Sequence, residues 1–312
     1  MLFIIYKIYI YPKNCLKMKK RLLLLLPLLM CGLMLQAKSA LVVIAHGSPM
    51  MSWRKPVLAL EHKVDSLVKA KGLSNISYVR VAMMEYTEPS VASVIKDCEK
   101  QGVDTVFALP LFIAPSSHSE EDLPNLLGLK FTPDVREELA EENAELVKSP
   151  LRIILGPTLY NTDILEKVML NNVKQMSQNP KDEALLLVAH GDPERIGFWQ
   201  ILLYRTCEYV KKHTGITYAD GELIEMGTGM DKEMLPLIEK AAKEKKRVLV
   251  QGIYLTSTIA GMARRNQMEV KQADIVKKYG TQVVYSENGI LPNASNAIAN
   301  WIVERTEEFL KH

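Results

Sequence analysis

The chain has 312 residues, of which 48% are hydrophobic and 24% are charged. This composition is typical of globular proteins, and the length suffices for two domains of about 100 to 150 residues each. The formal net charge is +3, but seven basic residues fall before Ala40, where no acidic residue occurs, and the rest of the chain has a net charge of −4. That remainder lacks the basic surface that nucleic-acid binding needs, so we expect no nucleic-acid partner.

The first 39 residues are typical of a targeting segment. A basic cluster at 19–21 precedes an apolar run at 22–35, and small residues on both sides of Lys38 form a cleavage signal. The apolar run is too short to cross a hydrocarbon core of about 30 Å as a helix. We therefore expect an exported, periplasmic protein with no membrane span after signal removal. A lipid anchor at Cys31 is the less favoured alternative, because Met30 stands where a lipobox needs a small residue.

From residue 41 onward, apolar runs alternate with amphipathic segments. Strands are expected at 41–46, 76–82, 103–110 and 151–156, and again at 184–190, 219–224, 246–254 and 281–286. Helices are expected at 56–71, 89–101, 162–177, 197–213, 231–245 and 294–310. This alternation predicts parallel sheets covered by helices.

The second half of the chain repeats the first. Ala45-His46-Gly47-Ser48 follows the first expected strand, and the similar Ala189-His190-Gly191-Asp192 follows the fifth. A cluster of Gln, Asn, Pro and Lys at 177–182 marks the joint between the halves. The fold class we predict is α/β, with two tandem Rossmann-like domains and an active site in the cleft between them.

The predicted division of the chain is a presequence at 1–39, an N-terminal catalytic α/β domain at 40–180 and a C-terminal α/β domain at 181–312. One segment, 125–149, has no equally long partner in the second half. Its charged part, 136–145, is expected to form a solvated helix that decorates the surface.

Cysteine usage excludes a thiolate metal site. Two cysteines fall in the presequence, while Cys98 and Cys207 lie in predicted helices, one in each half. The chain has no Cys-x-x-Cys pair, so ligands for a thiolate zinc site or an iron–sulfur cluster are missing. We expect Cys98 and Cys207 to be buried free thiols.

Three polar side chains of the first half follow three predicted strands. His46 follows the first strand, Glu85 the second and His118 the third. In open parallel sheets, ligands bind at the carboxyl ends of the strands. Two imidazoles and a carboxylate that converge there can bind a borderline divalent metal ion or accept protons near neutral pH.

Each of these residues also has a structural explanation. A histidine at a strand end is often a hydrogen-bonded packing residue, and Glu85 can simply solvate a loop. His118 precedes Ser119-Glu120-Glu121-Asp122, a pattern typical of a helix start, in which its ring would be incidental.

Taken together, three motifs in order resemble one family. They are His46-Gly-Ser, the stretch from Glu85-Tyr-Thr to Pro-Ser90, and Pro110-Leu-Phe-Ile-Ala-Pro-Ser-Ser-His118 followed by Glu121-Asp122-Leu-Pro124. They are similar to the class II tetrapyrrole chelatases, the CbiX-like sirohydrochlorin cobaltochelatases, in the two-repeat form. The resemblance covers the chain after Ala40.

This resemblance implies an enzyme that inserts cobalt(II), or in relatives iron(II) or nickel(II), into a metal-free tetrapyrrole without a nucleotide cofactor. The metal is then a substrate. His46 and His118 match the family's histidine pair and Glu85 matches an acidic position, which implies that all three bind the metal and take part in catalysis. Metallation removes two N–H protons from the macrocycle, so neutral imidazoles that ligate and then accept protons suit this chemistry.

The remaining expected substrate contacts are Ser48, Ser116, Ser117, His190 and Arg264. The second half has neither histidine nor acid at 256–260, so the first half should carry catalysis. His190 then faces the cleft as a secondary ligand or is vestigial. Arg264 either binds substrate carboxylates in a bidentate manner or is a charged surface residue without a substrate contact.

The sequence also bears on three other functions. An exported haem, tetrapyrrole or metal carrier with the chelatase fold and no turnover is the main alternative, because an export signal is unusual for tetrapyrrole biosynthesis. A histidine-phosphatase-like enzyme would need an arginine where Ala45 stands. Dinucleotide binding is disfavoured, because no GxGxxG follows a strand. The sequence leaves a homo-oligomer open.

Overall fold

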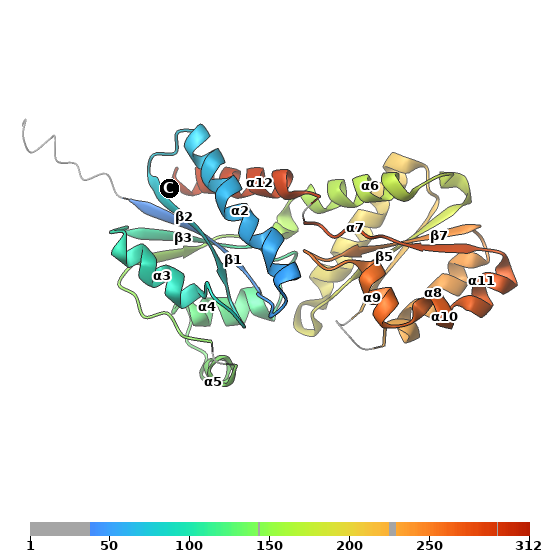
Figure 1. Cartoon of the computed structure of the whole chain (residues 1–312), viewed down its shortest axis with the longest axis horizontal. Helices are drawn as coiled ribbons and strands as arrows, with labels where there is room; N and C mark the ends of the chain where they lie inside the picture. Colours follow the sequence, from blue (N-terminus) through green and yellow to red (C-terminus); the bar gives the residue numbers. More distant parts are fainter. Residues whose placement is uncertain (1–37, 143, 225–228, 292) are drawn as a thin grey trace, which may run out of the picture. The chain divides into compact units, whose positions relative to one another are not determined.

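The structure is a computed structural model that describes residues 38–142, 144–224, 229–291 and 293–312 (Figure 1). Within them, residues 38–312 form one compact unit. The predicted presequence lies outside the described residues, apart from Lys38 and Ser39. No helix in the described ranges combines the length and the apolar character that a membrane crossing demands.

The strands of the first half form one parallel sheet of order β2-β1-β3-β4. Its strands are β1 (Ser39–Ala45), β2 (Ile76–Met83), β3 (Thr105–Pro110) and β4 (Arg152–Leu155). The helices α2 (Met51–Ala70) and α12 (Ser295–Phe309) cover one face, and α3 (Val91–Lys100) and α4 (Leu123–Leu126) cover the other (Figure 1). The helix α5 (Pro133–Glu141) follows α4.

The strands of the second half form a second parallel sheet with the equivalent order, β6-β5-β7-β8. Its strands are β5 (Glu183–Ala189), β6 (Tyr218–Leu223), β7 (Arg247–Ile253) and β8 (Gln282–Tyr285). On one face lie α6 (Ile164–Met176) and α7 (Ile196–Thr214); on the other lie α8 (Met230–Ala242), α9 (Ile259–Arg265), α10 (Met268–Lys271) and α11 (Ala273–Tyr279). These two helix-covered parallel sheets confirm the predicted α/β fold class.

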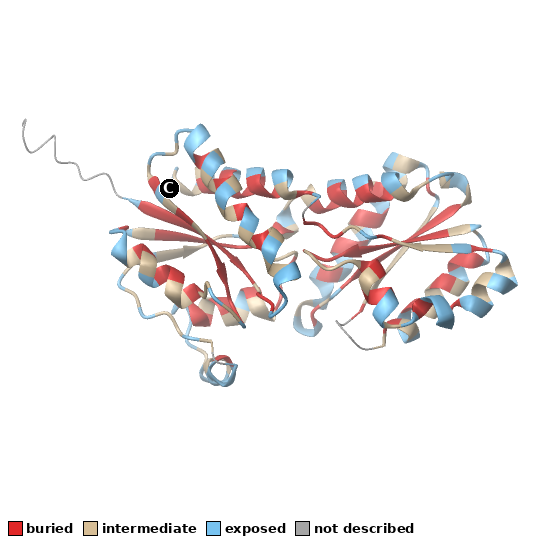
Figure 2. Cartoon of the chain, in the orientation of Figure 1, coloured by how far each residue is buried: buried red, intermediate tan, exposed pale blue. Residues whose placement is uncertain are grey.

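The inner strands β1 and β5, one in each sheet, are buried on both faces, as Figure 2 shows. Along β1, Leu41 and Val43 belong to the core under α2 and α12, while Val42 and Ile44 belong to the core under α3 and α4. Side chains of a strand point alternately to opposite faces, so a strand covered on both sides must be apolar throughout. This requirement explains the continuous apolar run that the sequence displays there.

Each sheet is partly covered by a helix from the other half of the chain. Helix α12 packs against α2, and Phe309 stacks on Phe107 of β3 with ring centroids 4.7 Å apart. Conversely, α6 packs against α7, where Glu166 pairs with Arg205 at 2.7 Å. The sequence did not predict this exchange of helices, and the domain boundary at residue 180 stays a prediction.

The predicted strands and long helices are confirmed, with shifts at their ends. Strand β1 begins at Ser39, two residues earlier than expected, because the Asp104 backbone N–H donates to the carbonyl of Lys38 at 2.8 Å. Cys98 and Cys207 are free and buried, as predicted. Burial raises the pKa of the Cys98 thiol to about 11 and that of Cys207 to about 12.

Candidate metal centre

Three polar side chains meet at the carboxyl ends of three neighbouring strands. His46 directly follows β1, Glu85 follows β2 by two residues, and His118 begins a π-helical turn, His118–Asp122, after β3. One ligand atom from each residue lies within 4.8 Å of the other two. Strand β1 has β2 on one side and β3 on the other, and such a switch point is where open parallel sheets bind ligands. The structure thus brings together the three residues that the sequence singled out.

Two backbone hydrogen bonds hold the turn after β1 against the turn after β2. The Glu85 N–H donates to the carbonyl of His46 at 2.9 Å, and the Met84 N–H donates to that of Ala45 at 2.8 Å. Between them, Gly47 has a φ of +107°, and a Cβ at this position would lie 2.3 Å from the Glu85 carbonyl oxygen. Only glycine fits such an approach, so the His-Gly pair is what places His46 beside Glu85.

The spacing of the three residues suits one divalent ion. His46 Nε2 lies 3.6 Å from one oxygen of Glu85, and His118 Nδ1 lies 3.9 Å from the other. The two imidazole rings meet edge to face, with centroids 4.6 Å apart. Ligands about 2.0–2.2 Å from a metal lie about 3.0–3.5 Å from each other, so His46 Nε2 and the Glu85 oxygen are already near the spacing of two ligands of one ion. His118 would offer its Nε2, because its Nδ1 contacts Asp122.

Exposure differs among the three. The Glu85 side chain is 4% exposed, whereas those of His46 and His118 are 31% and 41% exposed. The carboxylate therefore lies beneath the two imidazoles, which remain open to a ligand from solvent. A bound cation would neutralise a carboxylate that is otherwise almost fully desolvated.

His118 is held by a carboxylate of its own turn. Its Nδ1 lies 2.7 Å from Asp122 Oδ2, four residues further on. A carboxylate that accepts from one ring nitrogen fixes the tautomer and leaves the other nitrogen, Nε2, as the lone-pair donor. Asp122 is part of the third motif in the sequence, where no role was predicted for it; the available signal was its four-residue spacing from His118 at a helix start.

The environments of the two histidines shift their titration in opposite directions. Burial lowers the pKa of His46; Glu85 opposes this effect, and the rings of His118 and His190 reinforce it. Burial alone would also lower the pKa of His118, but the hydrogen bond and charge of Asp122, together with Glu85, raise it above its ordinary value. His46 is thus suited to stay neutral as a ligand, and His118 is the more basic of the pair.

Tyr86, which the sequence analysis left without a role, lies beside the centre. Its ring centroid is 5.8 Å from that of His46, and the residue is 64% exposed. Its φ of +69° is unusual for a residue other than glycine, and such strain is concentrated at functional sites. The centre therefore has an exposed aromatic ring at its edge.

The three serines expected to contact substrate are engaged within the chain. Ser48 Oγ accepts from the Met50 N–H at 3.1 Å, and Ser116 Oγ from the Ser119 N–H at 3.4 Å. Ser117 donates through both N–H and Oγ to Asp192, at 2.9 and 2.8 Å. Their substrate roles stay predictions.

The other two expected substrate residues belong to the second half. His190 is exposed, its Nδ1 lies 2.8 Å from the Gly191 carbonyl oxygen, and it is close enough to influence the pKa of His46. Arg264 lies on α9, where its exposed guanidinium binds Glu287 through both carboxylate oxygens. His190 is therefore near the centre, while Arg264 is occupied by a carboxylate of the protein itself.

One cavity of the described residues lies away from this centre. It has a volume of about 450 Å³ and is lined by Ser39, Thr105 and Arg152, at the amino ends of their strands, together with residues of α12. The candidate metal centre is at the carboxyl edge of the same sheet, after β1, β2 and β3. The predicted cleft between the halves stays a prediction.

Comparison with solved structures defines the class of fold. The sirohydrochlorin chelatase SirB from Bacillus subtilis subspecies spizizenii, solved in complex with cobalt, aligns with a TM-score of 0.59 at 14% identity, over 86% of this chain and 96% of that one. SirB from Bacillus subtilis with Fe3+ aligns with a TM-score of 0.62 at 15% identity, over 87% and 95%. Both halves of the chain together thus have the chelatase fold.

Sequence comparison finds similarity to one family in the first half of the chain. The CbiX family model matches residues 40–176. The sirohydrochlorin cobaltochelatases of Methanococcus maripaludis and Methanocaldococcus jannaschii are 36% and 33% identical over 90 residues, which are 29% of this chain. The match spans 58% and 59% of the length of these curated relatives. The residues that match this model, 40–176, contain His46, Glu85 and His118.

Proposed function

We propose that this protein is a class II chelatase that inserts a divalent metal ion into a metal-free tetrapyrrole of the sirohydrochlorin type. Cobalt(II) is the first candidate, with iron(II) and nickel(II) as alternatives. The convergence of His46, Glu85 and His118 within 4.8 Å on a chelatase fold carries the proposal. Two imidazoles and one carboxylate bind all three metals, so the ligand set does not select among them.

The chemistry exchanges one divalent cation for two pyrrole N–H protons. His46, whose pKa is lowered by burial, offers a neutral ring nitrogen to the ion. Glu85 supplies negative charge from beneath. His118, whose pKa Asp122 raises, is the stronger base and takes up one proton when the ion passes to the macrocycle; the ring of His46, released by the ion, accepts the other. Each residue thus has a role that follows from its environment.

The test is the initial rate of cobalt(II) insertion into sirohydrochlorin, followed anaerobically by absorption. We expect the protein to exceed the uncatalysed rate and His46→Ala and His118→Ala each to lower its rate by about 10²-fold or more. The control is His213→Ala, because His213 lies on α7 with its ring against the Tyr209 carbonyl oxygen at 2.7 Å. A wild-type rate equal to the uncatalysed rate would refute the proposal, and tight stoichiometric binding without insertion would indicate a carrier.

We also propose export to the periplasm. The basic cluster at 19–21 and the apolar run at 22–35 support it. Cell fractionation with N-terminal sequencing of the mature protein tests it. An intact N-terminus in the cytoplasmic fraction would contradict export.

A further inference from the structure

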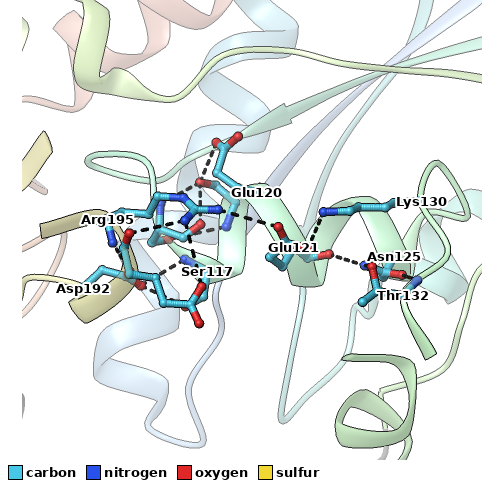
Figure 3. A network of polar contacts seen from close by, with 11 residues as sticks. Ser117, Glu120, Glu121, Asn125, Lys130, Thr132, Asp192 and Arg195 are labelled. Atoms are coloured by element: carbon cyan, nitrogen blue, oxygen red, sulfur yellow. Dashed lines mark hydrogen bonds and ion pairs between the residues drawn. The ribbon is translucent and has the colours of Figure 1, made fainter. Parts of the chain in front are cut away.

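Two features that break the repeat symmetry contact the same short segment, residues 117–121, which contains His118. One is Asp192, which stands in the second half where the first half has Ser48. The other is the extra segment 125–149, which begins in α4 and includes α5. Figure 3 shows the polar network in which both features meet the turn.

Asp192 connects the second half to the residue before His118. Its Oδ2 accepts two hydrogen bonds from Ser117, from the backbone N–H at 2.9 Å and from the hydroxyl at 2.8 Å. Its Oδ1 accepts from the backbone N–H of Arg195 at 2.9 Å (Figure 3). Asp192 is only 8% exposed, so both oxygens are committed to these partners. Hydrogen bonds to a charged, largely buried acceptor are among the stronger ones in proteins.

Two further contacts tie the second half to this loop. Arg195 Nη2 lies 3.6 Å from an oxygen of Glu121, inside the π-helical turn. Trp199, on α7, donates its indole N–H to the Pro115 carbonyl oxygen at 3.1 Å. The second half therefore holds the loop before His118 and the turn after it.

The extra segment braces the same turn from within the first half. Lys130 pairs with the second oxygen of Glu121, and the fully buried Asn125 donates its amide N–H to the Glu121 carbonyl oxygen at 2.9 Å. Asn125 Oδ1 in turn accepts from the Thr132 N–H at 2.7 Å (Figure 3). Glu121 is thus the point where the two braces meet.

We infer that the second half, which lacks its own histidine pair, acts as a clamp on the metal centre, with Asp192 as a positioning residue that fixes Ser117 and hence the ring of His118. This inference rests on the proposed function for its meaning in metal insertion. Ser48, the equivalent residue of the first half, shows why position 192 needs an aspartate. The Ser48 hydroxyl accepts one hydrogen bond within its own turn, from the Met50 N–H at 3.1 Å. Asp192 performs that local role toward Arg195 and also reaches across to Ser117.

The test measures cobalt(II) binding without tetrapyrrole, by the visible absorption of the ion. Asp192→Ser restores the residue of the first half and keeps a hydroxyl for the Arg195 N–H, but is too short to reach Ser117. We expect its cobalt dissociation constant to rise about 10- to 100-fold, the range for loss of a partner that orients a ligand. We also expect the absorption bands to shift toward those of His118→Ala.

Two variants separate positioning from general stability. Asp163→Ser removes an exposed carboxylate that pairs with Lys167 at the start of α6, and should leave cobalt affinity and spectrum unchanged. Asp192→Asn keeps the length and one carbonyl oxygen for Ser117, so its affinity should lie between wild type and Asp192→Ser. If Asp192→Ser fails to fold, Ser117→Ala replaces it and should still weaken cobalt binding several-fold.

Wild-type cobalt affinity in a folded Asp192→Ser protein would overturn the inference, as would an equal loss in Asp163→Ser. In the Ser117→Ala substitute test, unchanged affinity would overturn it too. The cobalt titration needs no macrocycle. It therefore still tests whether Asp192 positions His118 if the protein fails to insert metal. Absence of insertion by the wild type would instead refute the proposed function.

Discussion

Gly47→Ala tests how the backbone holds the metal centre together. The new Cβ would lie 2.3 Å from the Glu85 carbonyl oxygen, on a residue with a φ of +107°. The positive φ costs about 1–2 kcal/mol for an alanine. The overlap is with backbone, which cannot rotate away, and overpacking of this kind costs about 1–3 kcal/mol more. We expect a loss of about 2–5 kcal/mol in the free energy of unfolding, with Glu85 pushed away from His46.

The matched control is Gly215→Ala at the end of α7. Gly215 also has a positive φ, +84°, but its Cβ would meet nothing within 4 Å. Gly215→Ala should therefore lower the free energy of unfolding only by the cost of the positive φ, about 1–2 kcal/mol. The difference between the two variants isolates the clash with Glu85.

Urea unfolding followed by circular dichroism gives both free energies, and titration with cobalt(II) under native conditions reports the centre. We expect Gly47→Ala to bind cobalt at least about tenfold more weakly than wild type, since a displaced carboxylate no longer supports the ion. Gly215→Ala should bind like wild type. Equal unfolding losses in the two variants, together with unchanged cobalt affinity in Gly47→Ala, would show that the contact between the two turns does not position Glu85.

In the metal-free protein, NMR should find the pKa of His118 above the ordinary value of about 6.5 and that of His46 below it. At low pH, protonation of His118 therefore stabilises the fold and protonation of His46 destabilises it. The reverse order of the two pKa values would contradict the environments assigned to the two rings. Cys98 and Cys207, with pKa values of about 11 and about 12, should react with a thiol reagent only after denaturation, and rapid labelling of the native protein would be inconsistent with their burial. Phe309→Ala should lower the free energy of unfolding by about 2 kcal/mol through loss of the half-buried stack on β3, and an unchanged value would show that α12 does not stabilise the first sheet.

The fold was largely predictable because its signals are local. Apolar runs such as 41–46 and 184–190 report strands buried on both faces, and the repeated His-Gly turns report the duplication. The exchange of α6 and α12 was not predictable, because both helices are amphipathic and either sheet offers an apolar face. Their partners are set by three-dimensional packing, as in the stack of Phe309 on Phe107.

The centre itself could be anticipated, because carboxyl ends of parallel strands meet at one edge. His46, Glu85 and His118 each follow a strand, and this placement alone makes their convergence an expectation. The partners that orient them were harder to predict. For Asp122, the only signal in the sequence was its four-residue spacing from His118. Asp192 contacts Ser117, which lies 75 positions earlier in the chain. No periodicity of the sequence predicts a contact over such a separation.

The most direct test of the account is X-ray absorption spectroscopy at the cobalt edge on protein loaded with one equivalent of cobalt(II). A centre made of His46, Glu85 and His118 predicts scattering from two imidazole rings, with one ring lost in either histidine-to-alanine variant. A first shell of oxygen alone, or a spectrum that neither variant changes, would contradict it.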